Sequence, residues 1–177
     1  MVPVPVRLLA EKGGIPMAQS QSRLRVQKAT ALLREEHHKV KKLFREYEAA
    51  GDESFHEKAG LFTRIREELS VHATIEEEIF YPAVEPLRRG KSTGEKVVKE
   101  AREEHKIVST LLDELSELTP ADKTFDAKMK VLTENVEHHA EEEETDMFPL
   151  FDQLSQDEQA QVTERLNIRK RELSDSV

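Results

Sequence analysis

The chain has 177 residues, of which 36% are charged, and its formal net charge at pH 7 is −9. This length is sufficient for one domain with a buried core. The acidic balance disfavours nucleic acid as a partner, because surfaces that bind nucleic acid are basic. The sequence has no cysteine, which excludes disulfides, iron–sulfur clusters, thiolate zinc sites and thiol catalysis. Any metal ion must therefore be held by histidine and carboxylate.

The composition favours long amphipathic helices over sheet, because glycine and proline are sparse while Glu, Lys, Leu, Ala and Arg are abundant. No apolar run reaches the roughly 18 residues of a membrane span, so we expect no membrane segment. Residues 1–16 lack the continuous apolar region of a signal peptide, and we expect a cytoplasmic protein. We assign residues 1–21 to a disordered N-terminal arm.

Helix start and stop signals divide the first half of the chain. Ser22 is the expected N-cap of a first helix, which ends near residue 50 at the breaker Gly51-Asp52. Ser54-Phe55-His56-Glu57 has the capping-box pattern and opens a second helix. We expect that helix to reach Tyr81, because Pro82 follows.

The second half shows the same kind of signals. Ser92-Thr93-Gly94-Glu95 is another capping-box pattern, and it opens a third helix that ends near Leu118. Thr119-Pro120 places an N-cap before a first-turn proline and is expected to open a fourth helix, which runs to about Pro149. Residues 155–158 (Ser-Gln-Asp-Glu) cap a last helix.

These elements predict an all-α fold, an up-down-up-down four-helix bundle with an extra C-terminal helix. We place the bundle at residues 22–154, and the extra helix and tail at residues 155–177. Each bundle helix carries an apolar stripe with steps of three and four residues. One histidine interrupts each stripe, and on the second and fourth helices a glutamate follows one turn later. These six inward positions are His37, His72, Glu76, His105, His139 and Glu143.

An internal repeat relates the two halves of the bundle. Arg34-Glu35-Glu36-His37 recurs in the second half as Arg102-Glu103-Glu104-His105, and His72 recurs at nearly the same spacing as His139. We therefore expect two helical hairpins related by a pseudo-two-fold axis, each contributing two histidines and one glutamate. With a rise of about 1.5 Å per residue, all six groups can meet at one level of the bundle.

Burial of these six groups indicates a metal centre. Without partners, each buried carboxylate or imidazole would cost several kcal/mol. Two cations offset that cost, because carboxylates can bridge them and neutral imidazoles can cap them. Six protein ligands on two octahedral metals leave positions for an exogenous ligand, which is typical of a reactive site.

Other polar residues near these positions are expected elsewhere. His38 and His138 lie about 100° around their helices from the inward face. A single histidine on an apolar stripe is usually a satisfied core residue, and the repetition on four helices favours the metal-ligand interpretation. Glu141, Glu142 and Glu144 are expected to form a solvated face.

The pattern resembles the hemerythrin-like HHE cation-binding family, whose hallmark is His, His-x-x-x-Glu, His and His-x-x-x-Glu on four successive helices. The resemblance covers about residues 24–154. It implies a non-haem centre of two iron ions with an oxo or hydroxo bridge, and two bridging glutamates. The implied ligands are His37, His72, Glu76, His105, His139 and Glu143. Manganese and zinc accept the same ligand types.

The chain departs from the oxygen-carrying hemerythrins that it resembles in fold. Those proteins place a second histidine one turn after the third-helix histidine, where this chain has Ser109. They also have an aspartate at the position of Glu144. A site richer in oxygen ligands favours the oxidised metal, which disfavours a reversible oxygen carrier.

Two functional hypotheses follow, and they leave open whether the protein is an enzyme. The first is a di-iron protein that binds or reduces small species such as O₂, peroxide or NO. The second is a non-enzymatic iron or oxygen sensor, or an iron-handling module. It is favoured by the C-terminal helix, which can pack on the bundle, on a partner or on a second copy in a homo-oligomer. A metal-free structural bundle ranks last.

Overall fold

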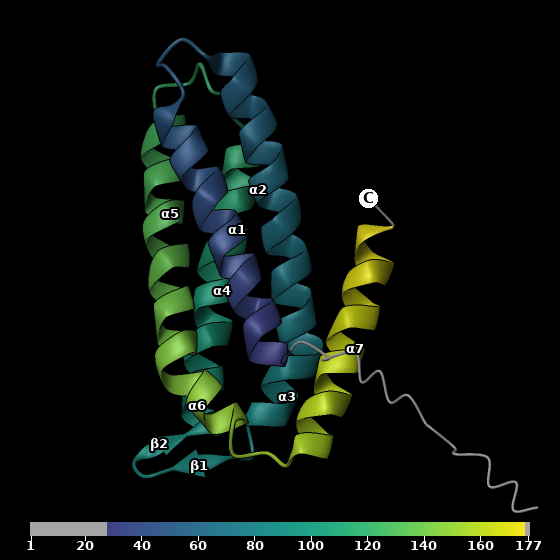
Figure 1. Cartoon of the computed structure of the whole chain (residues 1–177). Coiled ribbons are helices and arrows are strands. Elements are labelled where there is room, and N and C mark those ends of the chain that lie inside the picture. Colours follow the sequence, from purple (N-terminus) through teal and green to yellow (C-terminus); the bar gives the residue numbers. More distant parts are fainter. Residues whose placement is uncertain (1–27, 176–177) are drawn as a thin grey trace, which may run out of the picture.

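The computed structural model describes residues 28–175, in which four long helices form an up-down-up-down bundle (Figure 1). The predicted all-α bundle is therefore confirmed. The predicted N-terminal arm and the N-cap Ser22 lie outside the described residues. The bundle helices are α1 (Ala29–Ala49), α2 (Phe55–Ile75), α4 (Gly94–Ser116) and α5 (Phe125–Glu142).

Two of these helices do not end where a proline was expected to stop them. From α2 the chain passes through a π-helical turn, η1 (Glu76–Phe80), into the short helix α3 (Tyr81–Val84). From α5 it passes through η2 (Glu143–Met147) into α6 (Phe148–Phe151). Each proline lies in the first turn of the helix after its π-turn, where the missing N–H is tolerated.

The start of α5 corrects the prediction for the fourth helix. Thr119-Pro120 does not open it, because Thr119 is held in a turn instead. A carboxylate oxygen of Asp122 accepts hydrogen bonds from the backbone N–H of Thr119 at 2.7 Å and from its hydroxyl at 2.8 Å. The helix begins only at Phe125.

The start of α4 also differs slightly from the prediction. Its N-cap is Thr93 instead of Ser92, and the side chain of Thr93 accepts a hydrogen bond from the backbone N–H of Lys96. A small antiparallel ribbon, β1 (Arg88–Arg89) and β2 (Ser92–Thr93), precedes this helix. Its turn contains Gly90 at φ 61, a left-handed conformation that glycine adopts without steric penalty.

The predicted C-terminal helix is present as α7 (Gln156–Ser174). The capping box at its start is confirmed, because Ser155 and Glu158 cap each other reciprocally. This helix lies outside the bundle beside α2 (Figure 1) and contacts α1, α2 and η1. Its Val162 and Leu166 are buried against them.

The apolar core is split into two clusters. One surrounds Phe44, Phe62 and Leu132 near the α1–α2 and α4–α5 loops. The other surrounds Phe80 and Phe151 near α3, α6 and α7. The four histidine positions fall between the two clusters along their helices. Within residues 28–175, no helix is long and apolar enough to cross a membrane.

Candidate metal centre

The structure brings the six inward side chains together between the two apolar clusters. Each is buried, and none is more than 9% exposed. They come from all four bundle helices and both π-turns. The members of this group, called the inner cluster below, are His37, His72, Glu76, His105, His139 and Glu143.

The two glutamates of the inner cluster each face two imidazoles. The oxygens of Glu76 lie 3.1 Å from Nε2 of His72 and 3.5 Å from Nε2 of His105. One imidazole is on the glutamate's own helix and the other belongs to the opposite hairpin. A carboxylate in this position can bridge two cations.

Glu143 repeats this arrangement in the second hairpin. Its oxygens lie 3.8 Å from Nε2 of His139 on its own helix and 3.3 Å from Nε2 of His37 on α1. The inner cluster therefore has the pseudo-two-fold symmetry expected from the repeat.

Possible ligand atoms of the inner cluster fall into two overlapping groups, within each of which they lie no more than 4.8 Å apart. One group is His37, His72, Glu76 and Glu143, and the other is Glu76, His105 and His139. Because Glu76 belongs to both groups, the geometry suits two adjacent cations that share this carboxylate.

Each imidazole is oriented by a further carboxylate at its outer nitrogen. Nδ1 of His37 donates to Glu144 at 2.9 Å and Nδ1 of His72 to Glu36 at 2.9 Å. In the other hairpin, Nδ1 of His105 faces Glu77 at 2.8 Å and Nδ1 of His139 faces Glu104 at 2.7 Å. We call Glu36, Glu77, Glu104 and Glu144 the outer carboxylates.

The outer carboxylates determine what the imidazoles can bind. An ionised carboxylate only accepts hydrogen bonds, so the proton of each neutral ring lies on Nδ1. Nε2 of a neutral ring then carries the lone pair, which faces the inner cluster. Carboxylate partners of this kind fix the orientation of metal-binding histidines and raise their basicity.

The π-turns place the two inner glutamates. Each turn begins at a glutamate, and the N–H five residues later donates to its carbonyl oxygen, from Tyr81 to Glu76 and from Phe148 to Glu143. Such bulges occur frequently at functional sites. The sequence repeat contained the two turns, but periodicity alone did not reveal the additional residue in each.

The pKa values of the two carboxyl groups of the inner cluster are shifted in opposite directions. Burial and the nearby charge of Glu143 raise the pKa of Glu76 well above its usual value. Burial also acts to raise the pKa of Glu143, but the charges of His139 and His37 outweigh it and lower this pKa.

Three of the imidazoles also have shifted pKa values, and burial is the main cause that lowers the pKa of His72. Burial and the neighbouring His139 lower the pKa of His105 to about 4. Burial acts in the same direction on His139, but Glu143 and Glu104 outweigh it and raise its pKa.

One aromatic pair breaks the pseudo-symmetry of the site. The hydroxyl of Tyr81 lies 3.1 Å from Nε2 of His105. Phe148 occupies the equivalent position in the second half of the repeat and stacks against His37, with ring centroids 6.1 Å apart. Of these two equivalent positions, only Tyr81 therefore presents a hydroxyl donor to the inner cluster. Burial and the charges of Glu143 and Glu76 raise the pKa of Tyr81 well above its usual value, so this hydroxyl keeps its proton.

A small cavity adjoins the imidazoles on the side away from the π-turns. It offers about 20 Å³ to a water-sized sphere, which is room for one or two waters. All four histidines of the inner cluster line it, together with aliphatic side chains such as Val40, Leu69, Val108 and Val136.

The neighbouring polar residues agree only partly with the sequence-based expectations. His38 and His138 are exposed, as expected. Glu144 does not belong to a solvated face, because it bonds His37 and also accepts from Arg34 at 2.8 Å. Periodicity missed it, although the repeat aligns it with Glu77.

Comparison with known proteins supports the fold and a cation-binding family. The family model of the hemerythrin HHE cation-binding domain matches residues 28–151. The chain is also similar to a solved structure, a hemerythrin HHE cation-binding domain-containing protein from Mycobacterium kansasii. That structure has a TM-score of 0.73 and 26% sequence identity, and the match covers 84% of this chain and 88% of that one.

A curated relative is a DNA nickase from Nostoc sp., which is 28% identical over 117 residues. The match covers 66% of this chain but 31% of the nickase. The chain thus spans about a third of that protein's length, and the nickase name describes a much longer molecule.

Proposed function

Because the chain belongs to the hemerythrin HHE cation-binding family, we propose that its inner cluster holds two iron ions that bind or reduce small oxygen or nitrogen species. The observation that carries this proposal is the set of unsatisfied atoms at the centre. Nε2 of His37, Nε2 of His72 and all four oxygens of Glu76 and Glu143 are buried without a hydrogen-bond partner. Such atoms are costly unless they bind a cation.

The donor set fits iron. It consists of imidazole nitrogen and carboxylate oxygen, which suit iron, manganese and zinc, and Glu76 is positioned to bridge two ions. When bound, two iron ions would supply electrons and open coordination positions for a small ligand. The protein contributes the oriented imidazoles, the cavity beside them and the shielding by two apolar clusters.

Tyr81 is the residue best placed to act on a bound ligand. Its hydroxyl retains a proton and lies among the inner side chains. With Nε2 of His105 engaged by a metal, this hydroxyl would be free to donate a hydrogen bond to an anionic ligand. Hydrogen bonds directed at developing charge are a main source of rate acceleration in enzymes.

Metal analysis of the full chain, purified without chelators, tests the proposal. We expect two iron ions per chain and near-ultraviolet absorption that azide or peroxide changes. A colourless protein that contains no iron after aerobic reconstitution with Fe²⁺ would refute it. Manganese or zinc bound at full occupancy in its place would retain the metal site and reject the iron chemistry.

A second candidate is an iron or oxygen sensor, and it is favoured by one contact of α7. Lys170 on this helix binds Glu36, the outer carboxylate of His72, so a change at the metal site could reach α7. Peroxide turnover by the iron-loaded chain supports the first candidate. Absence of turnover, together with iron-dependent oligomerisation, supports the sensor.

A further inference from the structure

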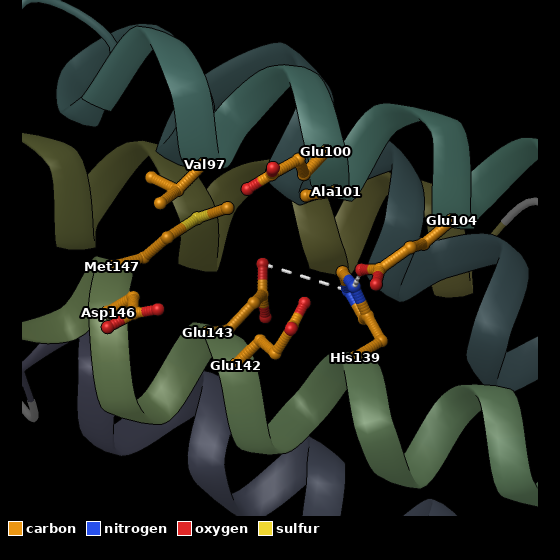
Figure 2. A pocket seen from close by; sticks show the side chains of 9 residues that line it. All are labelled: Val97, Glu100, Ala101, Glu104, His139, Glu142, Glu143, Asp146 and Met147. Carbon is orange, nitrogen blue, oxygen red and sulfur yellow. Dashed lines mark hydrogen bonds and ion pairs between the residues drawn. The ribbon is translucent and has the colours of Figure 1, made fainter. Parts of the chain in front are cut away.

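The two hairpins differ on the faces that lead to the inner cluster. On the first hairpin, α7 contacts α1, α2 and η1, and its Lys170 pairs with Glu36. On the second, the equivalent face has a small hollow of about 30 Å³, partly open to solvent, between α4 and the segment α5–η2. Figure 2 shows the carboxylates of Glu100, Glu142 and Glu143 in this space.

The residues on the two faces also differ in kind. Three positions that are apolar and buried with Val162 and Leu166 on the first face are carboxylates on the second. Because α7 does not cover the second face, polar residues are expected at its three positions. This does not explain why all three are acidic. The pairs, which the repeat aligns with each other, are Leu32 and Glu100, Ile75 and Glu142, and Ile79 and Asp146.

We call this space the acidic hollow. At its mouth, Glu100, Glu142 and Asp146 are exposed. Glu104 lies deeper and is partly buried. At its inner end lies Glu143, which is 1% exposed and whose two oxygens have no hydrogen-bond partner. Carboxylates therefore line the hollow from solvent to the inner cluster.

A wider depression continues the acidic hollow outward. It shares Glu100, Glu104 and Glu142 with the hollow. Lys99 also borders it, but its ammonium is paired with Glu95 at 2.7 Å. In addition, atoms of Glu104, His138 and Glu142 lie within 4.8 Å of one another, a spacing that could hold a metal ion.

We propose that the acidic hollow is the route by which a divalent cation enters the inner cluster, collected at Glu100, Glu142 and Asp146 and received by Glu143. This inference rests on the proposed function, since the cation is the Fe²⁺ that the site would hold. A mouth of one charge sign raises the local concentration of the opposite ion and speeds its capture. On the first hairpin the equivalent positions are filled by Leu32, Ile75 and Ile79, which are buried in one cluster with Val162 and Leu166 of α7.

Uptake kinetics test the route. The metal-free triple variant Glu100→Gln/Glu142→Gln/Asp146→Asn removes the charges at the mouth and leaves the inner cluster and Glu104 intact. In anaerobic Fe²⁺ uptake, sampled over time by quenching with a chelator, we expect loading about tenfold slower than in the wild type. The final iron content should be unchanged. The difference should shrink as salt is added, because salt screens exposed charges.

A matched variant separates the route from general electrostatics. Glu134→Gln/Glu137→Gln/Glu141→Gln removes the same charge from exposed positions of α5 outside the hollow, and it should load at nearly the wild-type rate. Equal slowing in both variants, or no slowing in the first, would overturn the route. A lower final content at an unchanged rate would also overturn it, because these residues would then hold iron rather than pass it on.

The wild type distinguishes the two proposals. If it takes up no Fe²⁺, the proposed function fails and the route fails with it. If it loads normally while the first triple variant loads just as fast, only the route is wrong. Circular dichroism of each metal-free variant verifies that the bundle is folded before loading.

Discussion

Lys170 places its ammonium nitrogen 2.6 Å from Oε1 of Glu36, whose other oxygen accepts from Nδ1 of His72. Glu36 is 5% exposed. Although burial alone acts to raise its pKa, the bonds to His72 and Lys170 outweigh this effect and lower it. The appended helix α7 thus supplies the positive charge that keeps a buried outer carboxylate ionised.

Replacement of this lysine should destabilise the protein. In Lys170→Met the long side chain remains, but an oxygen of Glu36 loses its partner. An unsatisfied buried acceptor costs about 1–3 kcal/mol, so we expect the free energy of unfolding in denaturant to fall by that amount. Arg169→Met is the control, since Arg169 pairs with the exposed Glu78 at the surface. Equal effects of the two substitutions would show that the Lys170 contact has no special role.

The fold was predictable because its signals are local and repeated. Apolar periodicity identified four helices, and the Ser155 capping box identified α7. The predicted start of the fourth helix was wrong, because Thr119 of the N-cap pattern Thr119-Pro120 instead donates its backbone N–H to the carboxylate of Asp122 in a turn. The helix ends were misplaced because a π-turn allows a helix to continue past a proline, and periodicity does not report such a turn.

The convergence of the six inner side chains was predictable to a similar extent. The repeat selected the inner cluster, because surface histidines have no reason to recur on four apolar stripes. The outer carboxylates were not identified, since their side chains cross from one helix to another and helical spacing does not indicate such pairs. A signal was nevertheless present, because Glu36 and Glu104, like Glu77 and Glu144, are related by the repeat.

Glu144 provides a test of the outer carboxylates. In Glu144→Gln the side chain keeps its shape but no longer offers a charged acceptor to Nδ1 of His37. Loss of such a partner typically lowers metal affinity 10–100-fold, and we expect a decrease of about that size in a competition titration with a chelator. Glu141→Gln, an exposed position on α5, should leave the affinity unchanged. Wild-type affinity in Glu144→Gln would argue against the orienting role.

Metal binding should be visible as thermal stabilisation. A ligand at 100 times its dissociation constant adds about 2.7 kcal/mol to the folded state, and in a domain of this size each kcal/mol shifts Tm by about 2–4 °C. We expect Fe²⁺ under anaerobic conditions to raise the wild-type Tm by about 5–10 °C. Glu143→Gln should lose most of this shift. A full shift in that variant would remove Glu143 from the ligand set.

Iron binding should release protons. The raised pKa values of Glu76 and His139 mean that both groups hold protons more tightly than usual in the metal-free protein, and a cation competes with those protons. The apparent affinity for Fe²⁺ should therefore increase as the pH rises. Calorimetry in two buffers of different ionisation enthalpy measures the released protons. An affinity independent of pH would contradict these protonation states.

The raised pKa of Glu76 should also make the stability of the metal-free fold decrease as the pH rises. A group whose pKa is raised on folding contributes stability that is fully present below its unfolded pKa and is lost as the pH rises toward the folded value. For Glu76 the loss begins above about pH 4.5. The metal-free wild type should therefore lose stability relative to Glu76→Gln, which cannot ionise, as the pH is raised from 4.5. Parallel stability curves would exclude this contribution.

A substitution at Tyr81 should change the reaction with peroxide without changing metal binding. Tyr81→Phe removes the hydroxyl and makes this position identical to Phe148 in the other hairpin, so iron content and fold should be preserved. If the hydroxyl donates to a bound ligand, peroxide consumption should fall about 100-fold, the lower end for a positioned proton donor, and the absorption of the azide complex should shift. Tyr47→Phe is the matched control, because its hydroxyl bonds Asp126 at the far end of the bundle. Peroxide consumption by Tyr81→Phe at the wild-type rate, with an unshifted azide spectrum, would assign this tyrosine to packing alone.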